Sequence, residues 1–146
     1  MTIDCCFDGY FGYFFRWSML ENWNFIRDKI DFMTAENGRT DGTFTDFDSL
    51  DDKIDNLYYY MQFIKFGFGR CVRDACRMIQ NGQMSRGEGL ELVRKYDAEF
   101  PKTYHDEHLE YLGLDEAAFT EIVDKHRDPE IWEMRGNAWE LKHPPA

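Results

Sequence analysis

The chain lacks a hydrophobic run long enough to cross a membrane, and it lacks an N-terminal segment of the kind that directs secretion. It also has little cysteine. Its four cysteines are Cys5, Cys6, Cys71 and Cys76, and none of them forms a C-x-x-C pair. This spacing argues against a disulfide framework, and Cys76 is predicted to be a core residue because it falls on an apolar helix stripe. We therefore expect a soluble, cytoplasmic protein.

Positive charge is also scarce. Lys and Arg number 17 against 28 Asp and Glu, which gives a net charge of −11 and argues against nucleic-acid binding through phosphate neutralisation. The basic residues are unevenly placed, however. Residues 65–95 carry a local net charge of +4, and the remainder carries −15. A basic island in an acidic chain favours a small anionic ligand over a polymer.

Hydrophobic periodicity predicts a mainly α fold, a single helical domain over residues 1–146 with five to six helices and a short C-terminal β-hairpin. Ser18, Ser49 and Ser85 each precede an acidic residue by three positions, which is the pattern of a capping box at a helix start. The predicted helices cover residues 19–30, 50–66, 70–80, 85–96, 104–112 and 115–127. The hairpin turns at Gly136-Asn137 and places Trp132, Met134, Trp139 and Leu141 on one face.

The most informative stretch joins two of these helices. Gly67 and Gly69 interrupt the apolar pattern after Lys65, and a new stripe follows them. Arg70, Arg73 and Arg77 lie opposite that stripe at helical spacing. A helix start with nearby basic side chains is suited to an anion. The alternative is that these arginines form the solvated face of an ordinary helix.

Three segments, the first of which contains this glycine break, together carry a resemblance to a known family. Residues 60–70 end in Lys-Phe-Gly-Phe-Gly-Arg, Arg86-Gly87-Glu88 follows, and residues 96–101 read Tyr-Asp-Ala-Glu-Phe-Pro. These segments resemble the C-terminal region of the N-acetyl sugar amidotransferase family, which belongs to the PP-loop ATP pyrophosphatase superfamily. The resemblance covers about residues 12–143 and is densest over residues 50–101. Gln80 and Gly87 depart from the family pattern, which has an arginine and an acid there.

The resemblance implies an enzyme of lipopolysaccharide or O-antigen biosynthesis. Such enzymes use ATP, cleaved to AMP and pyrophosphate, to convert an acetamido group on a nucleotide-linked sugar into an acetamidino group. The ammonia comes from a separate glutaminase partner. The superfamily binds phosphate through a Ser-Gly-Gly-x-Asp-Ser-type loop, and this sequence has no such motif. We therefore expect the chain to be the C-terminal part only, inactive alone and without a cofactor of its own. ATP and Mg belong to the complete enzyme, whose ATP-binding domain or subunit is a partner.

The sequence identifies candidate substrate-binding residues but no catalytic residue. The candidates are Lys65, Gly67, Gly69, Arg70, Arg73, Arg77 and Arg86. His105 and His108 are three residues apart, but two ligands do not make a zinc site. The aspartates of residues 46–55 lack the glycine and closing glutamate of a calcium-binding loop. No metal site is therefore expected.

A second function remains open, in which the chain is a non-catalytic module that docks a nucleotide-binding or glutaminase subunit. The aromatic segment near the start of the chain bears on it, because such a segment is either a buried strand or an entry segment that another surface covers. We expect self-association, or a partner, through residues 7–17. The aromatic residues of this segment are Phe7, Tyr10, Phe11, Tyr13, Phe14, Phe15 and Trp17.

Overall fold

The computed structural model describes residues 10–145. This part of the chain forms seven helices and one two-stranded antiparallel sheet, so the predicted mainly α class with a C-terminal hairpin is confirmed. The residues divide into two compact units, one up to Phe32 and one from Met33 onward, and each is described by itself. No helix among the described residues is both long and apolar enough to span a bilayer.

The N-terminal unit contains α1 (Phe11–Phe14) and α2 (Met19–Ile26). The Ser18 hydroxyl accepts a hydrogen bond from the Glu21 N–H at 3.2 Å, which caps α2 as predicted, although α2 ends at Ile26 and not at residue 30. The described part of the aromatic segment, residues 10–17, is a single helical turn with flanking extended residues. Tyr10 is 92% exposed and Tyr13 is 86% exposed. Phe7 lies outside the described residues.

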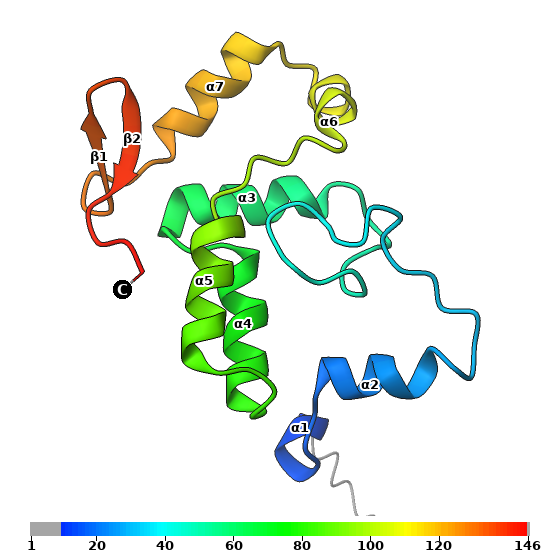
Figure 1. The fold of residues 1–146 in the computed structure, drawn as a ribbon. Coiled ribbons are helices and arrows are strands. Elements are labelled where there is room, and N and C mark those ends of the chain that lie inside the picture. The colour runs from blue at the N-terminus through cyan, green and yellow to red at the C-terminus, as the bar shows by residue number, and fades with distance from the viewer. Residues whose placement is uncertain (1–9, 146) are drawn as a thin grey trace, which may run out of the picture. The chain divides into compact units, whose positions relative to one another are not determined.

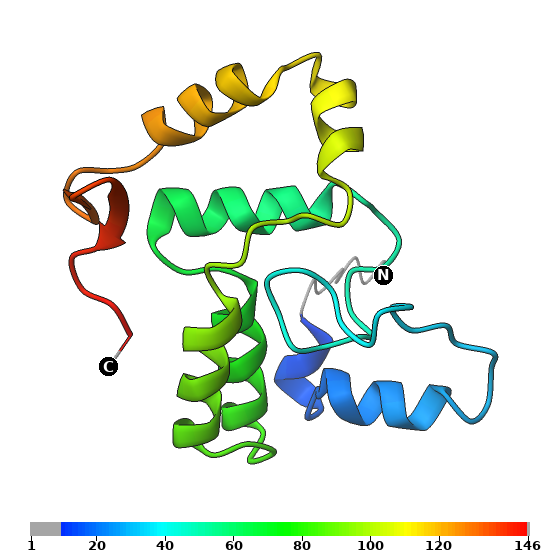
Figure 2. The same cartoon turned by 45° about the horizontal axis from the view of Figure 1, so that its top comes forward.

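The larger unit is built around three helices (Figure 1). They are α3 (Asp55–Phe66), α4 (Arg70–Gln80) and α5 (Arg86–Tyr96). α4 and α5 run antiparallel side by side, and α3 crosses one end of the pair in both views (Figure 2). The Ser85–Glu88 capping box at the start of α5 is confirmed, with both of its hydrogen bonds present.

The remaining helices and the hairpin lie on the side of α3 that faces away from α4 and α5 (Figure 1). They are α6 (His105–Leu112), α7 (Glu116–Lys125), β1 (Trp132–Arg135) and β2 (Ala138–Leu141). Asp115 caps α7 by accepting from the Ala118 N–H at 2.8 Å. In the hairpin Trp132 pairs with Leu141 and Met134 with Trp139, so the prediction that these four side chains share one face of the hairpin is confirmed.

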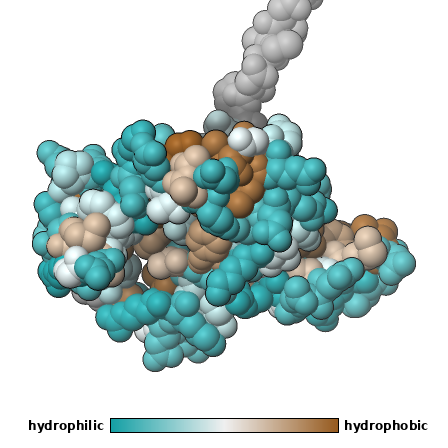
Figure 3. Space-filling view, turned by 90° about the horizontal axis from the view of Figure 1, so that it is seen from above, coloured by the Kyte–Doolittle hydropathy of each residue, from teal (hydrophilic) through white to brown (hydrophobic). Residues whose placement is uncertain are grey.

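Most residues on the molecular surface drawn in Figure 3 are hydrophilic, which agrees with the high charge content of the chain.

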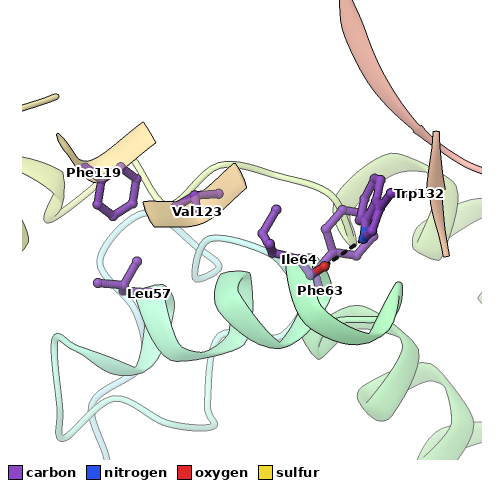
Figure 4. Close-up of a cluster of buried hydrophobic side chains, with 6 residues drawn as sticks. All are labelled: Leu57, Phe63, Ile64, Phe119, Val123 and Trp132. Carbon is purple, nitrogen blue, oxygen red and sulfur yellow. Dashed lines mark hydrogen bonds between the residues drawn. The ribbon is translucent and has the colours of Figure 1, made fainter. Parts of the chain in front are cut away.

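Two clusters of buried side chains stabilise this unit. The first joins α3, α7 and β1 and consists of Leu57, Phe63, Ile64, Phe119, Val123 and Trp132 (Figure 4). The second joins α4 to α5 and contains Cys71, Ala75 and Val93. Cys71 is fully buried and Cys76 is exposed, so the prediction that Cys76 is a core residue was wrong. Burial raises the pKa of the Cys71 thiol to about 12 and keeps it protonated.

The long helix starts later than predicted. α3 begins at Asp55, not at residue 50, and Ser49 is not its cap. Ser49 has a φ of 55°, and its hydroxyl donates to the Asp55 carboxylate at 2.5 Å. Asp52 instead accepts from the Ile54 N–H at 3.0 Å, which closes a local turn. A side chain that bonds nearby backbone in this way competes with helix formation.

The segment before α3 is held against the turn that follows α5. Arg39 donates two hydrogen bonds to Glu99, at 2.6 and 2.7 Å, and the Gly42 N–H donates to the same carboxylate at 3.0 Å. The Arg39 guanidinium also lies 4.6 Å from the centre of the Tyr96 ring. These hydrogen bonds from Arg39 lower the pKa of Glu99 below its ordinary value.

We expect Glu99→Gln to lower the free energy of unfolding by about 1–2 kcal/mol near neutral pH, because a two-pronged charge-assisted pair is lost. The pKa of Glu99 is lower in the folded protein than in the unfolded chain, where it is about 4.3. Ionised Glu99 therefore contributes fully to the free energy of unfolding above a pH of about 4.3, and this contribution is lost as the pH falls through the lowered pKa of the folded state. Urea titrations of both proteins between neutral and acid pH measure this. A stability difference that does not shrink in acid would contradict it.

Candidate functional site

The two glycines of the predicted site are required by the geometry of the α3–α4 junction. Gly67 ends α3 with a φ of 74°, and a Cβ at this position would lie 2.9 Å from Ile131. At Gly69 a Cβ would lie 2.9 Å from the Asp97 carbonyl oxygen. Real Cβ atoms do not approach other atoms this closely. Both glycines are therefore explained by packing within the protein.

The start of α4 does bind an anion, but the anion is a side chain of the chain itself. The Asp97 carboxylate accepts from the Gly69 N–H at 2.8 Å and from the Val72 N–H at 3.0 Å. Asp97 is 6% exposed, and burial raises its pKa while these backbone donors act in the opposite direction. The backbone N–H groups at the start of α4, which were predicted to bind a phosphate, thus already donate to Asp97.

We expect Asp97→Ala to lower the free energy of unfolding by about 2–3 kcal/mol, because the cap of α4 is removed and two buried N–H groups lose their acceptor. Asp97→Asn keeps one oxygen acceptor and should cost less. Denaturant unfolding monitored by circular dichroism measures both variants. Equal stability of Asp97→Ala and the unmodified chain would show that the carboxylate does not act as the cap.

Arg70 is buried, so the alternative that the arginines form a solvated helix face does not hold for this residue. Its side chain is 0% exposed and lies 3.8 Å from the Asp74 carboxylate. One guanidinium nitrogen donates to the Asp48 carbonyl, while Nε and Nη1 make no hydrogen bond among the described residues. Burial lowers the pKa of Arg70, and Asp74 opposes that shift. Residues 43–48 cover this face of α4, so Arg70 is held inside the protein.

Arg73 belongs to the same cluster. Its guanidinium pairs with Asp48, with Asp74 at 3.0 Å, and with the Tyr59 hydroxyl. Asp74 also accepts from the Thr43 hydroxyl at 2.7 Å and from the Thr45 hydroxyl at 3.2 Å. We call the six residues Thr43, Asp48, Tyr59, Arg70, Arg73 and Asp74 the arginine cluster. Every charge in it has an opposite charge nearby, so the cluster fixes residues 43–48 against α4.

The other predicted basic residues do not join the arginine cluster. Lys65 is exposed, with its Nζ 5.6 Å from the centre of the Phe66 ring. Arg77 is exposed in the last turn of α4, and Arg86 is exposed in the first turn of α5. The structure therefore brings together two of the five predicted cations. Ligand binding by these residues stays a prediction.

The two histidines singled out in the sequence bond to other parts of the protein. His105 Nε2 lies 2.8 Å from Glu116, and His108 Nε2 lies 2.9 Å from the Lys53 carbonyl oxygen. Among residues 10–145 no group of three or more His, Cys, Asp or Glu is arranged to hold a metal ion.

A cavity that the sequence did not predict lies under the hairpin. It has a volume of about 640 Å³, within the range of small-molecule sites. We call it the hairpin cavity. The residues that give it chemical character are Tyr60, Arg127, Trp132, Arg135, Trp139 and Lys142. Its only signals in the sequence were the aromatic face of the hairpin and the cations around it.

The hairpin cavity is lined by a guanidinium, that of Arg127, which lies close to two indoles. Arg127 lies 4.5 Å from the centre of the Trp132 ring and 5.6 Å from that of Trp139. Asp124 accepts from its Nε at 3.1 Å and fixes its orientation. Burial raises the pKa of the neighbouring Tyr60 hydroxyl, with Arg127 opposing the shift. This arrangement can bind an aromatic or anionic group.

A second cavity of about 410 Å³ lies between residues 33–40 and the start of α3. Its two cations are already paired, Arg39 with Glu99 and Lys53 with Glu107 at 2.6 Å. Glu36 and Asp52 also line it, so its charges balance. This cavity is less suited to an anion than the hairpin cavity.

The comparison with known families agrees with the region of densest resemblance. The model of the family described as LPS biosynthesis protein WbpG-like, C-terminal domain, matches residues 41–143. That range contains the α3–α4 junction, the arginine cluster and all residues that line the hairpin cavity except Pro144. No curated protein matches the chain. Because the match covers more than half of the sequence, the chain belongs to the WbpG-like C-terminal domain family of LPS biosynthesis proteins.

Proposed function

We propose that this chain is the substrate-binding C-terminal part of an ATP-dependent N-acetyl sugar amidotransferase of lipopolysaccharide biosynthesis. The observation that supports it is the family match over residues 41–143 together with the amidotransferase-like segments at residues 60–70 and 96–101. The substrate is a nucleotide-linked N-acetyl sugar. The proposal also places the protein in the cytoplasm.

In the reaction that we propose for the assembled enzyme, the acetamido oxygen is activated by ATP with release of pyrophosphate. Ammonia then adds to the same carbon, and the oxygen leaves with AMP, so that the C=O of the acetamido group becomes the C=N of an acetamidino group. The described residues offer no phosphate cradle at the α4 start, because Asp97 fills it. We therefore assign ATP binding to a separate PP-loop part and sugar binding to this chain.

The test is a reconstitution. The chain is combined with the ATP-binding part, a glutaminase, ATP, glutamine and a UDP-N-acetyl sugar, and the sugar is analysed by mass spectrometry. We expect the acetamidino product only when all three proteins are present, and neither pyrophosphate release nor product from the chain alone. Full activity without the chain would contradict a substrate-binding role.

A second candidate is the docking module, and one observation favours it. The aromatic residues between positions 10 and 17 are exposed, with Phe11 59%, Phe14 57% and Trp17 57% accessible. An exposed apolar patch of this kind marks an interface or an aggregation-prone surface. The proposed occupant is a second copy of the chain or the ATP-binding part.

Sedimentation of the purified chain measures self-association directly. We expect a dimer or larger species at tens of micromolar that dissociates when Tyr13 and Phe14 are replaced by Ser. The matched control is Tyr111→Ser, since Tyr111 is also exposed, at 81%, but lies in α6. A monomer at these concentrations would rule out self-association through this segment.

A further inference from the structure

We infer that the hairpin cavity binds the nucleoside diphosphate part of the nucleotide-linked sugar, with the base against the indole of Trp139 and the diphosphate against Arg135 and Lys142. This inference rests on the proposed function. The substrate site is then the hairpin cavity and not the α3–α4 junction, where the sequence predicted it, although both belong to the same unit. Four features of the structure support it.

The first feature is charge. Three cations line the hairpin cavity, Arg127, Arg135 and Lys142, against one lining carboxylate, Glu140. Arg127 and Arg135 are paired with carboxylates, and Lys142 is the lining cation that has no ion pair among the described residues. The whole chain carries −11, so a positive lining here is a local feature and not a consequence of composition. A diphosphate is attracted to such a lining, whereas a neutral sugar is not.

The second feature is the availability of donors at the mouth of the cavity. Lys142 gives one hydrogen bond, to the Pro129 carbonyl at 2.6 Å, and its ammonium group has two further protons. Arg135 pairs with Glu133 and with Glu140 at the exposed surface, where such pairs are weak and can be exchanged for a ligand. In the arginine cluster, by contrast, the Arg70–Asp74 pair is buried and the pairs of Arg73 are mostly shielded from solvent.

The third feature is aromatic surface with an unused donor. Trp132 is 4% exposed, and its N–H donates to the Ile64 carbonyl at 2.7 Å, so this indole is committed to the core. Trp139 lies diagonally across the hairpin and is only partly buried. Its buried N–H has no acceptor among the described residues. A buried donor without a partner is unfavourable, and a ligand oxygen would satisfy it.

The fourth feature is rigidity. Arg127 is held by Asp124 and lies against both indoles, so the floor of the cavity is formed before a ligand arrives. Trp132 joins the hairpin to α3, and Gly67 allows the side chains of Ile131 and Leu141 to approach the end of that helix. A pre-formed site loses less entropy on binding than a mobile one.

Calorimetric titration of the purified full chain tests the inference. The probes are UDP-N-acetylglucosamine, UDP, ADP, pyrophosphate, uridine and free N-acetylglucosamine, each up to millimolar concentration. We expect UDP and UDP-N-acetylglucosamine to bind with similar affinity, uridine and pyrophosphate to bind at least tenfold more weakly, and the free sugar not to bind. ADP distinguishes a specific pyrimidine site from a general stacking surface. Equal binding of pyrophosphate and UDP would overturn the role of Trp139.

The variants separate this cavity from the rest of the surface. Arg135→Ala combined with Lys142→Ala should weaken UDP binding roughly tenfold to hundredfold, because two charged donors are lost. Trp139→Phe keeps a ring but removes the N–H and should weaken it by about tenfold. The matched control is Lys125→Ala, an exposed lysine of the neighbouring α7 that pairs only with Glu121 in the described chain, and it should bind UDP normally. Circular dichroism verifies that each variant is folded.

The outcomes distinguish this inference from the proposed function. If UDP-N-acetylglucosamine binds and the hairpin variants do not weaken it, the hairpin cavity is not the site, although substrate binding by the chain stands. If binding is instead weakened by Lys65→Ala, the site expected from the sequence is correct. If neither UDP nor UDP-N-acetylglucosamine binds to the folded chain, the substrate-binding function is contradicted, and this inference with it.

Discussion

Replacing Asp74 with Ala is expected to lower the free energy of unfolding by about 3–5 kcal/mol, because it leaves a buried guanidinium without its counter-charge. Asp74 is 5% exposed and Arg70 is 1% exposed, so solvent cannot screen the charge that remains. Asp74 is also the acceptor for the Thr43 and Thr45 hydroxyls. The variant therefore loses the carboxylate that balances the charge of Arg70 and the hydrogen bonds that hold residues 43–45.

Two further variants show whether charge is the cause. A double variant, Arg70→Met with Asp74→Leu, removes both charges and should recover a large part of the loss, since replacing both members of a buried pair by apolar residues is often neutral. Asp115→Ala is the control, because it removes an exposed N-cap and should cost only about 1 kcal/mol. Urea unfolding measures all of them. A cost for Asp74→Ala no greater than that for Asp115→Ala would contradict the account of the arginine cluster.

Trp132→Ala is expected to cost about 3–5 kcal/mol, the range measured when a large buried aromatic is truncated. The indole lies 5.3 Å from the Phe63 ring in an edge-to-face contact, and its N–H donates to the carbonyl oxygen of Ile64 (Figure 4). The side chain thus provides both packing and a buried hydrogen bond between the hairpin and α3. Removing it leaves a cavity and an unpaired carbonyl.

Trp132→Phe separates the two contributions, because it keeps an aromatic ring but has no N–H, and we expect it to cost about 1–3 kcal/mol. Met134→Ala, in the same strand and 52% exposed, is the control and should change stability by less than about 0.5 kcal/mol. Thermal unfolding followed by calorimetry gives the three values. Similar losses for Trp132→Ala and Met134→Ala would show that the hairpin is not anchored through Trp132.

The helices of the C-terminal half could be predicted because their signals are local. Ser85 with Glu88, and Asp115 at the start of α7, each bond to groups three residues away, so sequence spacing alone identifies them. The hairpin follows from alternation around Gly136-Asn137 for the same reason. The start of α3 could not be predicted, since the sequence at Ser49 fits a cap equally well but its side chain bonds to Asp55 instead.

The site could be predicted only as a set of residue types. Nothing near Gly69 in the sequence shows that Asp97, 28 residues later, occupies the start of α4. Likewise, the burial of Arg70 depends on residues 43–48, which have no helical or strand periodicity to indicate where they lie. The hairpin cavity requires residues of α3, of the segment after α7 and of both strands. All three features depend on packing between residues far apart in the sequence, so local patterns could not predict them.

The most direct test of substrate binding by this chain is the nuclear magnetic resonance spectrum of its tryptophan indole N–H groups during titration with UDP-N-acetylglucosamine. The chain has four tryptophans, so the four signals can be assigned by substitution. We expect a saturable shift of the Trp139 signal, with a small change at Trp132, whose N–H is already bonded to Ile64. Unchanged indole and backbone amide signals would contradict substrate binding, whereas shifts confined to the backbone amides of residues 65–77 would contradict the hairpin cavity as the site.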